Sequence, residues 1–152
     1  MCIRDRVQTE TLKILGRYES KSLKHADLKV SCTCTRVNVR EGHTEAVFLS
    51  TKRRCEVDDV RDSMRRFAGV LRDLGLPSAP EELLTVNDDP FRPQPRLDRN
   101  VHGGMSTVVG RIRKDGALEN GIKYVLVSHN TKMGAAKGAV LVAEYLVKNG
   151  YV

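Results

Sequence analysis

The sequence has few aromatic side chains and lacks both long apolar runs and a glycine-rich nucleotide-binding fingerprint. Aromatic residues make up 5% of the chain, and none lies among the basic residues, where nucleic-acid-binding proteins place stacking platforms. No apolar run approaches the roughly 20 residues of a membrane span, and the N-terminus has no apolar segment typical of a signal peptide. We therefore expect a cytoplasmic protein that binds neither membrane nor nucleic acid.

The four cysteines form no Cys-x-x-Cys pair and have no accompanying histidine spacing. This pattern predicts no metal site. Cys32 and Cys34 alternate in a predicted strand, so their side chains are expected on the same face. The simplest interpretation is reduced core cysteines in a cytoplasmic protein.

The formal net charge is +7 over 152 residues, which raises the possibility of a basic interaction domain. The basic residues around 52–66 are, however, interleaved with acidic ones such as Glu56, Asp58 and Asp62. Such dispersed charge favours a solvated helix face. A non-catalytic basic interaction domain stays open as an alternative function.

The central stretch of the chain is Thr35–Glu45. Lys29–Val39 is rich in Val, Thr and Cys and predicts a strand, and a second strand is expected from Ala46. Glu41-Gly42 signals a turn between them, which would place His43 at the mouth of the sheet. Arg36, at the end of the first strand, offers a planar fork for a carboxylate, and His43 can exchange protons near neutral pH.

The remaining elements follow from periodicity and from Gly and Pro punctuation. They are a helix over Val7–Tyr18, an amphipathic helix over Glu56–Leu74, strands over Leu83–Val86, Met105–Arg113 and Ile122–Ser128, and a last helix from Asn130 to about Lys148. Asn130 and Thr131 are good cap residues for that last helix. Its first turns are unusually small in side-chain volume, which allows close packing against a backbone or a ligand.

Asp88–Gly104 contains most of the prolines, so it is predicted to be irregular and largely extended. Arg96, Asp98 and Arg99 lie within it. Two interpretations stay open for these three: they line a cleft or a subunit contact, or they form a surface ion-pair cluster.

Three separated blocks, 31–49, 93–113 and 122–144, resemble the aspartate-semialdehyde dehydrogenase family in its archaeal and fungal branch. Residues 31–48 of the first block read Ser-Cys-Thr-Cys-Thr-Arg-Val-Asn-Val-Arg-Glu-Gly-His-Thr-Glu-Ala-Val-Phe. The resemblance covers the C-terminal half of such an enzyme. It implies an α+β fold with a mixed, mostly antiparallel sheet and helices on one face, like the C-terminal domain of glyceraldehyde-3-phosphate-dehydrogenase-type enzymes.

The resemblance also implies a domain plan. Residues 1–6 do not fit the family pattern and are expected to be a non-native leader. Residues 7–128 would form the catalytic and dimerisation domain. Residues 129–152 would form a helix that packs on an NADP-binding domain outside this sequence, and the full-length protein would be a homodimer or homotetramer.

The family reaction is the NADP-dependent reductive dephosphorylation of L-4-aspartyl phosphate to L-aspartate 4-semialdehyde, in the biosynthesis of lysine, threonine and methionine. By resemblance, His43 is the acid/base group and Arg36 binds the substrate carboxylate. Glu10 and Lys13, three residues apart, bind substrate and phosphate. Asn130 and Thr131 contact the nicotinamide end of NADP, where a helix N-terminus would add free N–H groups.

The family's nucleophilic cysteine and its dinucleotide-binding half have no counterpart in these residues. Cys34 sits in the middle of a predicted strand, without a helix N-terminus to lower its pKa, and is not assigned that role. We therefore expect the chain to be inactive alone. A related acyl-CoA reductase, of the malonyl-CoA type, is the alternative enzyme.

Overall fold

The computed structural model describes residues 3–69 and 71–152. The chain forms two compact units, the first ending at Asn38 and the second beginning at Val39, and each is described by itself. The second unit holds a four-stranded sheet together with separate helices. The predicted α+β class with a mixed, mostly antiparallel sheet is therefore confirmed.

The first unit consists of one helix and a short hairpin. Its elements are α1 (Ile3–Ile14), β1 (Arg17–Glu19) and β2 (Ser22–Lys24), the two strands being antiparallel. The prediction of a helix over Val7–Tyr18 is correct in type, but the helix begins and ends earlier. Gly16 follows its end, and a side chain there would lie 2.3 Å from the Lys24 carbonyl oxygen, so glycine allows the hairpin to pass this close to the helix end.

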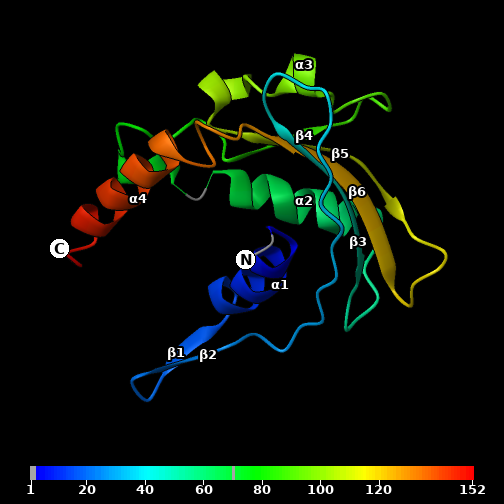
Figure 1. Cartoon of the computed structure of the whole chain (residues 1–152), viewed down its shortest axis with the longest axis horizontal. Coiled ribbons are helices and arrows are strands. Elements are labelled where there is room, and N and C mark those ends of the chain that lie inside the picture. The colour runs from blue at the N-terminus through cyan, green and yellow to red at the C-terminus, as the bar shows by residue number, and fades with distance from the viewer. Residues whose placement is uncertain (1–2, 70) are drawn as a thin grey trace. The chain divides into compact units, whose positions relative to one another are not determined.

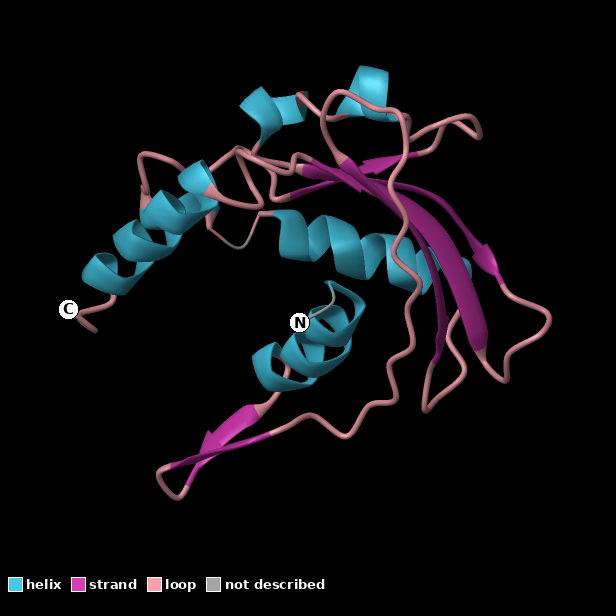
Figure 2. Ribbon diagram, in the orientation of Figure 1, coloured by secondary structure: helices cyan, strands magenta, loops and turns pink. Residues whose placement is uncertain are grey.

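The predicted strand over Lys29–Val39 is wrong. Among the described residues this stretch pairs with no strand, and it forms a long loop between β2 and the next strand (Figure 2). Its Val and Thr composition suits a strand, but no sheet edge in the second unit pairs with it, and Val37 is 66% exposed. Cys32 and Cys34 consequently do not share a strand face.

The second unit is built on a sheet in the order β3-β6-β5-β4 (Figure 1). The strands are β3 (His43–Ser50), β4 (Leu84–Asn87), β5 (Thr107–Lys114) and β6 (Gly121–Ser128). β6 is antiparallel to both β3 and β5, whereas β4 and β5 are parallel. The strand predicted over Met105–Arg113 corresponds to β5, and both of its faces are covered near Val108 and Val109, which lie on opposite faces and are both buried.

Helix α2 (Val57–Ala68) covers one face of this sheet, as Figure 1 shows. Its apolar stripe, including Val60 and Met64, packs on a core of Val109, Ile112 and Ile122. The Glu56 backbone N–H donates to the Asp59 carboxylate at 3.0 Å, which caps the helix start.

The predicted continuation of this helix to Leu74 is wrong. The helix ends at Ala68 and is followed by Gly69, and a separate 3₁₀ turn, η1 (Arg72–Leu74), comes after it. Gly75 ends that turn with a φ of +62°, which glycine adopts without steric cost. The apolar period of 3.6 runs through both segments, so the period alone does not reveal the break.

The proline-rich segment is less extended than predicted, because it contains the short helices α3 (Pro95–Asp98) and η2 (Val101–Gly104). Asp98 is only 1% exposed and its carboxylate accepts hydrogen bonds from Arg92 and from the Gln94 backbone N–H. For Asp98, this burial contradicts both interpretations, a residue that lines a cleft or a subunit contact and a member of a surface ion-pair cluster, because its ion pair with Arg92 encloses the carboxylate. Burial opposes ionisation of Asp98, but the hydrogen bonds from Arg92 and Gln94 outweigh it and hold its pKa below the ordinary value.

The last helix, α4, runs from Ala136 to Lys148 and does not begin at Asn130. Residues 130–135 form turns instead, in which the Ala136 N–H donates to the Thr131 carbonyl. The glycines of this region permit close backbone approach: a side chain at Gly134 would lie 2.6 Å from the Asn130 carbonyl oxygen, and one at Gly138 still closer to that of Met133. The small early face thus packs against the chain's own preceding turns.

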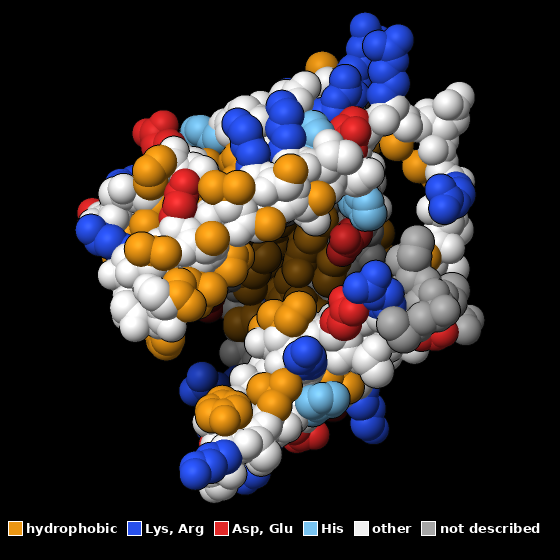
Figure 3. Space-filling model, turned by 60° about the vertical axis from the view of Figure 1, so that its left-hand side comes forward, with side chains coloured by type: hydrophobic (Ala, Val, Ile, Leu, Met, Phe, Trp, Pro, Cys, Tyr) orange, Lys and Arg blue, Asp and Glu red, His pale blue; other side chains and the backbone are white. Residues whose placement is uncertain are grey.

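Within the second unit, α4 packs through Leu141 on Leu76 and Met105. Apolar side chains nevertheless remain on the surface (Figure 3), among them Phe48 of β3 at 60% exposed and Val147 of α4 at 63%. No helix within the described residues is long and apolar enough to cross a membrane.

The buried Arg92–Asp98 pair leads to a prediction about stability. Asp98→Asn should lower the free energy of unfolding at neutral pH by about 1.5–3 kcal/mol, because Arg92 and the Gln94 N–H lose a charged acceptor. Since the folded pKa of Asp98 is lowered, the loss should be full above about pH 5 and shrink as the pH falls below about 4. Urea unfolding at both pH values measures this.

The matched control is Asp62→Asn, which removes a 61% exposed carboxylate 3.8 Å from Arg65. That change should cost less than about 1 kcal/mol. Equal losses in the two variants would show that the Arg92–Asp98 pair carries no special share of the stability.

Candidate functional site

His43 is the first residue of β3 and lies directly opposite Ser128 at the end of β6. Its imidazole is exposed. Gly42, with a φ of +107°, turns the chain onto the sheet here, and a side chain at Gly42 would lie 3.5 Å from the Ser128 carbonyl oxygen. The turn signal at Gly42 is therefore real, although it joins a loop to a strand and not two strands.

Arg36 lies in the first unit, in the long loop that replaces the predicted strand, and its side chain is exposed. An exposed guanidinium is available to a carboxylate ligand. His43 belongs to the second unit. The pairing of Arg36 and His43 in one site therefore stays a prediction.

Glu10 and Lys13 both lie on α1, so their spacing places them on one side of a helix as predicted. Glu10 accepts a hydrogen bond from Arg6 Nε at 2.9 Å, and both side chains are about half exposed. Such a surface pair contributes only about 0.3–0.5 kcal/mol, so it leaves Glu10 available to a ligand. Arg6 falls in the segment predicted to be a leader, and α1 already begins at Ile3.

Asn130 and Thr131 lie in the turn between β6 and α4, and both side chains are exposed. They are not the predicted helix caps, because α4 begins at Ala136 with Ala135 before it. The free N–H groups of the helix start are thus displaced along the chain from Asn130. A contact of Asn130 or Thr131 with a ligand would use the side-chain amide and hydroxyl.

The second unit brings His43 and the Asn130–Thr131 turn to the same end of the sheet. Ser128 links them, since it pairs with His43 and is followed at once by the turn. Its hydroxyl oxygen accepts a hydrogen bond from Thr107 Oγ1 at 3.0 Å, which ties the end of β6 to β5.

His129 received no role from the sequence, yet it is the buried residue of this end of the sheet, at 6% exposed. Its Nδ1 accepts a hydrogen bond from the Lys132 backbone N–H at 3.3 Å, and a Glu41 carboxylate oxygen lies 4.0 Å from the same nitrogen. The available signal was its position, directly after an apolar strand and directly before the predicted cofactor-contacting pair.

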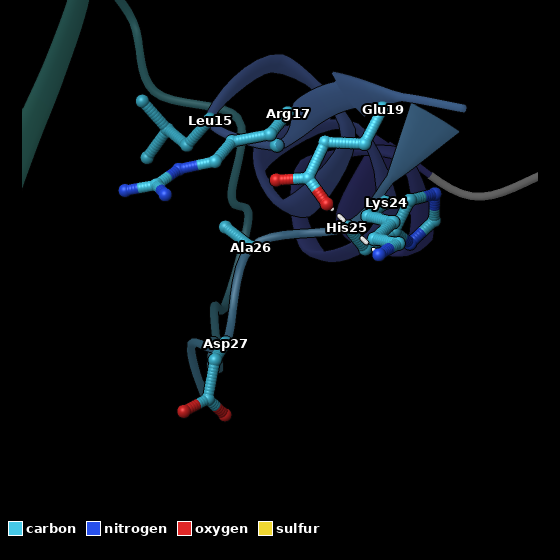
Figure 4. A pocket seen from close by; sticks show the side chains of 8 residues that line it. Leu15, Arg17, Glu19, Lys24, His25, Ala26 and Asp27 are labelled. Carbon is cyan, nitrogen blue, oxygen red and sulfur yellow. Dashed lines mark hydrogen bonds and ion pairs between the residues drawn. The ribbon is translucent and has the colours of Figure 1, made fainter. Parts of the chain in front are cut away.

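The first unit contains a cavity of about 350 Å³ beside the hairpin (Figure 4). It is lined by Leu15, Gly16, Arg17, Glu19, Lys24, His25, Ala26 and Asp27. Lys24 and Glu19 form an ion pair of 2.8 Å across it. None of the predicted site residues lines this cavity. Within the described ranges, no three His, Cys, Asp or Glu side chains are grouped so as to hold a metal ion.

Comparison with known proteins places the chain in a family. Residues 3–133 match the family model described as semialdehyde dehydrogenase, dimerisation domain. The aspartate-semialdehyde dehydrogenase of Methanothermobacter thermautotrophicus is 47% identical over 142 residues, which are 93% of this chain and 41% of that protein. The Candida albicans enzyme is 41% identical, with 93% of this chain and 40% of that protein covered.

Solved structures of aspartate-semialdehyde dehydrogenases also have a similar fold. The crystal structure of aspartate-semialdehyde dehydrogenase with NADP from Candida albicans superposes with a TM-score of 0.86 at 38% identity, covering 98% of this chain and 43% of that one. Aspartate-semialdehyde dehydrogenase II from Vibrio cholerae, complexed with ASA, gives a TM-score of 0.60 at 28% identity, covering 74% of this chain and 29% of that one. The chain spans about two fifths of the length of its curated relatives. By sequence and fold together, it belongs to the aspartate-semialdehyde dehydrogenase family and corresponds to its C-terminal dimerisation domain.

Proposed function

We propose that this chain is the catalytic and dimerisation part of an NADP-dependent aspartate-semialdehyde dehydrogenase, which converts L-4-aspartyl phosphate to L-aspartate 4-semialdehyde in amino-acid biosynthesis. The observation that carries the proposal is the exposed His43 at the first residue of β3, beside the Asn130–Thr131 turn, in a chain 47% identical to such an enzyme. A vibrio relative complexed with ASA supports the substrate class.

In this proposal His43 moves a proton to or from the reacting group. An imidazole suits that task because its ordinary pKa lies near neutral pH and the exposed ring can reach a ligand. Arg36 holds the substrate carboxylate with its planar guanidinium. Glu10 and Lys13 hold the substrate and the phosphate, one through its negative and the other through its positive charge.

NADP, when bound, supplies or accepts the hydride. The exposed amide of Asn130 and hydroxyl of Thr131 fit hydrogen bonding to such a cofactor, and their turn lies at the His43 end of the sheet. The relative from Candida albicans was solved with NADP, which supports this choice of cofactor. The thiol nucleophile and most of the cofactor site are proposed to lie outside this chain.

We also propose that the full-length protein is a homodimer or homotetramer. Phe48 is 60% exposed on the edge strand β3, and it shares a sheet face with Ala46 of β3 and with Val125 of β6, its diagonal neighbour. Exposed apolar side chains on an edge strand support an interface between copies of this chain.

The first test uses the 152-residue polypeptide by itself. It should not reduce NADP with aspartate semialdehyde and phosphate, because the proposed nucleophile lies outside it. Absorbance of NADPH, compared with a buffer blank, measures this. Turnover that disappears on Cys34→Ser would instead make Cys34 the nucleophile and contradict the assignment.

The second test needs a full-length protein, obtained from upstream coding sequence or by joining this chain to the N-terminal part of the Methanothermobacter relative. Arg36→Leu should lose about 2–5 kcal/mol of transition-state stabilisation, because a bound carboxylate loses a charge-assisted bidentate partner. The measurement is kcat/KM. Arg40→Leu, an exposed arginine nearby, is the matched control. An unchanged kcat/KM for Arg36→Leu removes this residue from the site.

In the same protein, His43→Ala should lower kcat by about 100-fold to 10,000-fold, the usual loss of a general acid/base. The melting midpoint should hardly change, since the ring is exposed. His25→Ala, also exposed, should leave kcat unaltered. A collapsed melting midpoint with normal kcat for the folded fraction would make His43 a packing residue.

A further inference from the structure

The ring of His129 is enclosed at the end of β6. Gly104 makes room for it: a side chain there would lie 2.8 Å from His129 Cδ2 and 2.7 Å from Lys132 Cδ. Gly104 also has a φ of +83°, so both the lack of space for a side chain and the backbone conformation require glycine. The imidazole is thus held in place and 6% exposed, with no freedom to serve as a solvent-exposed proton carrier.

The hydrogen bond to His129 identifies where its proton lies. Nδ1 accepts the Lys132 backbone N–H at 3.3 Å, and a nitrogen that accepts a hydrogen bond carries no proton. The neutral ring therefore has its hydrogen on Nε2. This bond closes the turn from 129 to 132, on which the exposed Asn130 and Thr131 are carried.

Glu41 lies near the same nitrogen without a hydrogen bond to it. Its Oε1 is buried and, within the described structure, has no hydrogen-bond partner, and it lies 4.0 Å from His129 Nδ1, too far for a hydrogen bond. A protonated ring would donate Nδ1–H to Glu41, but the Lys132 N–H would then lose its acceptor.

We propose that His129 is a positioning residue: through Nδ1 it fixes the Asn130–Thr131 turn against the strand end that bears His43. This inference rests on the proposed function for the roles of His43 and of the turn. The hydrogen bond by which His129 closes the turn does not depend on the proposed function, because it is present whether or not catalysis occurs. Glu41, two residues before His43, lies 4.0 Å from Nδ1, which in the neutral ring carries no hydrogen for its carboxylate to accept.

The experiment is amide hydrogen exchange by NMR on the whole 152-residue chain. His129→Gln places its amide at the Nε2 position and removes the acceptor for the Lys132 N–H, so exchange at Lys132 should become about threefold to tenfold faster, the worth of one hydrogen bond. His129→Asn keeps an oxygen near the Nδ1 position and should restore exchange to within about twofold of the unaltered chain. The Val127 amide of β6 serves as the internal reference for global opening.

Equal acceleration in the Gln and Asn variants would overturn the proposal, because it would mean that the ring acts only by filling space. So would Lys132 exchange that is unchanged in His129→Gln. Glu41→Gln should leave Lys132 exchange no faster than in the unaltered chain, and faster exchange would show that Glu41, not His129, supports the turn.

A measurement on the unaltered chain keeps the proposal testable if His129→Gln fails to fold. The ¹⁵N shifts of the His129 ring, above the ordinary pKa of histidine, should show hydrogen on Nε2 and a bare Nδ1. Hydrogen on Nδ1 overturns the proposal. Neither readout depends on turnover, so a failed dehydrogenase assay and a failed positioning role are distinguishable.

Discussion

All of β3 pairs with β6 in one antiparallel ladder, from His43 opposite Ser128 to Ser50 opposite Gly121. The placement of the proposed site depends on this register. Because side chains alternate along a strand, a slip by one residue would move His43 to the other face of the sheet. β6 resists such a slip, since Ile122 and Val127, on opposite faces, are 1% and 0% exposed. An exposed residue of the proposed site is thus fixed by its pairing with a strand that has no exposed residue.

β6 also determines where the segment between its end and α4 lies. At its end, the chain enters a series of turns before α4 begins, and these turns pack closely on one another and on η2. Gly104, Gly134 and Gly138 each stand where a side chain would overlap a neighbouring atom. The room that these glycines leave is occupied by backbone and by the His129 ring. The turn that carries Asn130 and Thr131 is therefore shaped by tight internal packing, even though their own side chains face solvent.

Much of the second unit was predictable from sequence, because the apolar residues that pack in its core repeat with the spacing of helices and strands. The α2 stripe, the strand after Gly121 and the turn at Gly42 are all present. The strand predicted over Lys29–Val39 is absent, because β propensity identifies a segment able to pair but not whether a partner edge exists. Asp98 was misjudged for a related reason: the partner that allows its burial, Arg92, belongs to a proline-rich segment without periodicity.

The candidate site residues also differ in how far their role depends on residues that are distant in the chain. His43 and Arg36 were selected through resemblance, and the structure places His43 at the first residue of β3 and Arg36 in a loop of the first unit. The position of His129 after an apolar strand was the one signal in the sequence, and its enclosure by Gly104 and Glu41, both far from it in the chain and close in space, could not be read from local patterns.

The late start of α4 changes the physical account of the proposed cofactor contact. A helix beginning at Asn130 would offer a ligand several aligned backbone N–H groups and the positive end of a helix dipole. The observed turns use several of those N–H groups internally: Lys132 donates to His129 Nδ1, Gly134 to the His129 carbonyl and Ala136 to the Thr131 carbonyl. A dipole-based attraction for a phosphate or a carboxamide is correspondingly weak at Asn130. In the proposed cofactor site, recognition would then depend on the direction in which the Asn130 and Thr131 side chains point, and the turn that His129 closes is proposed to set that direction.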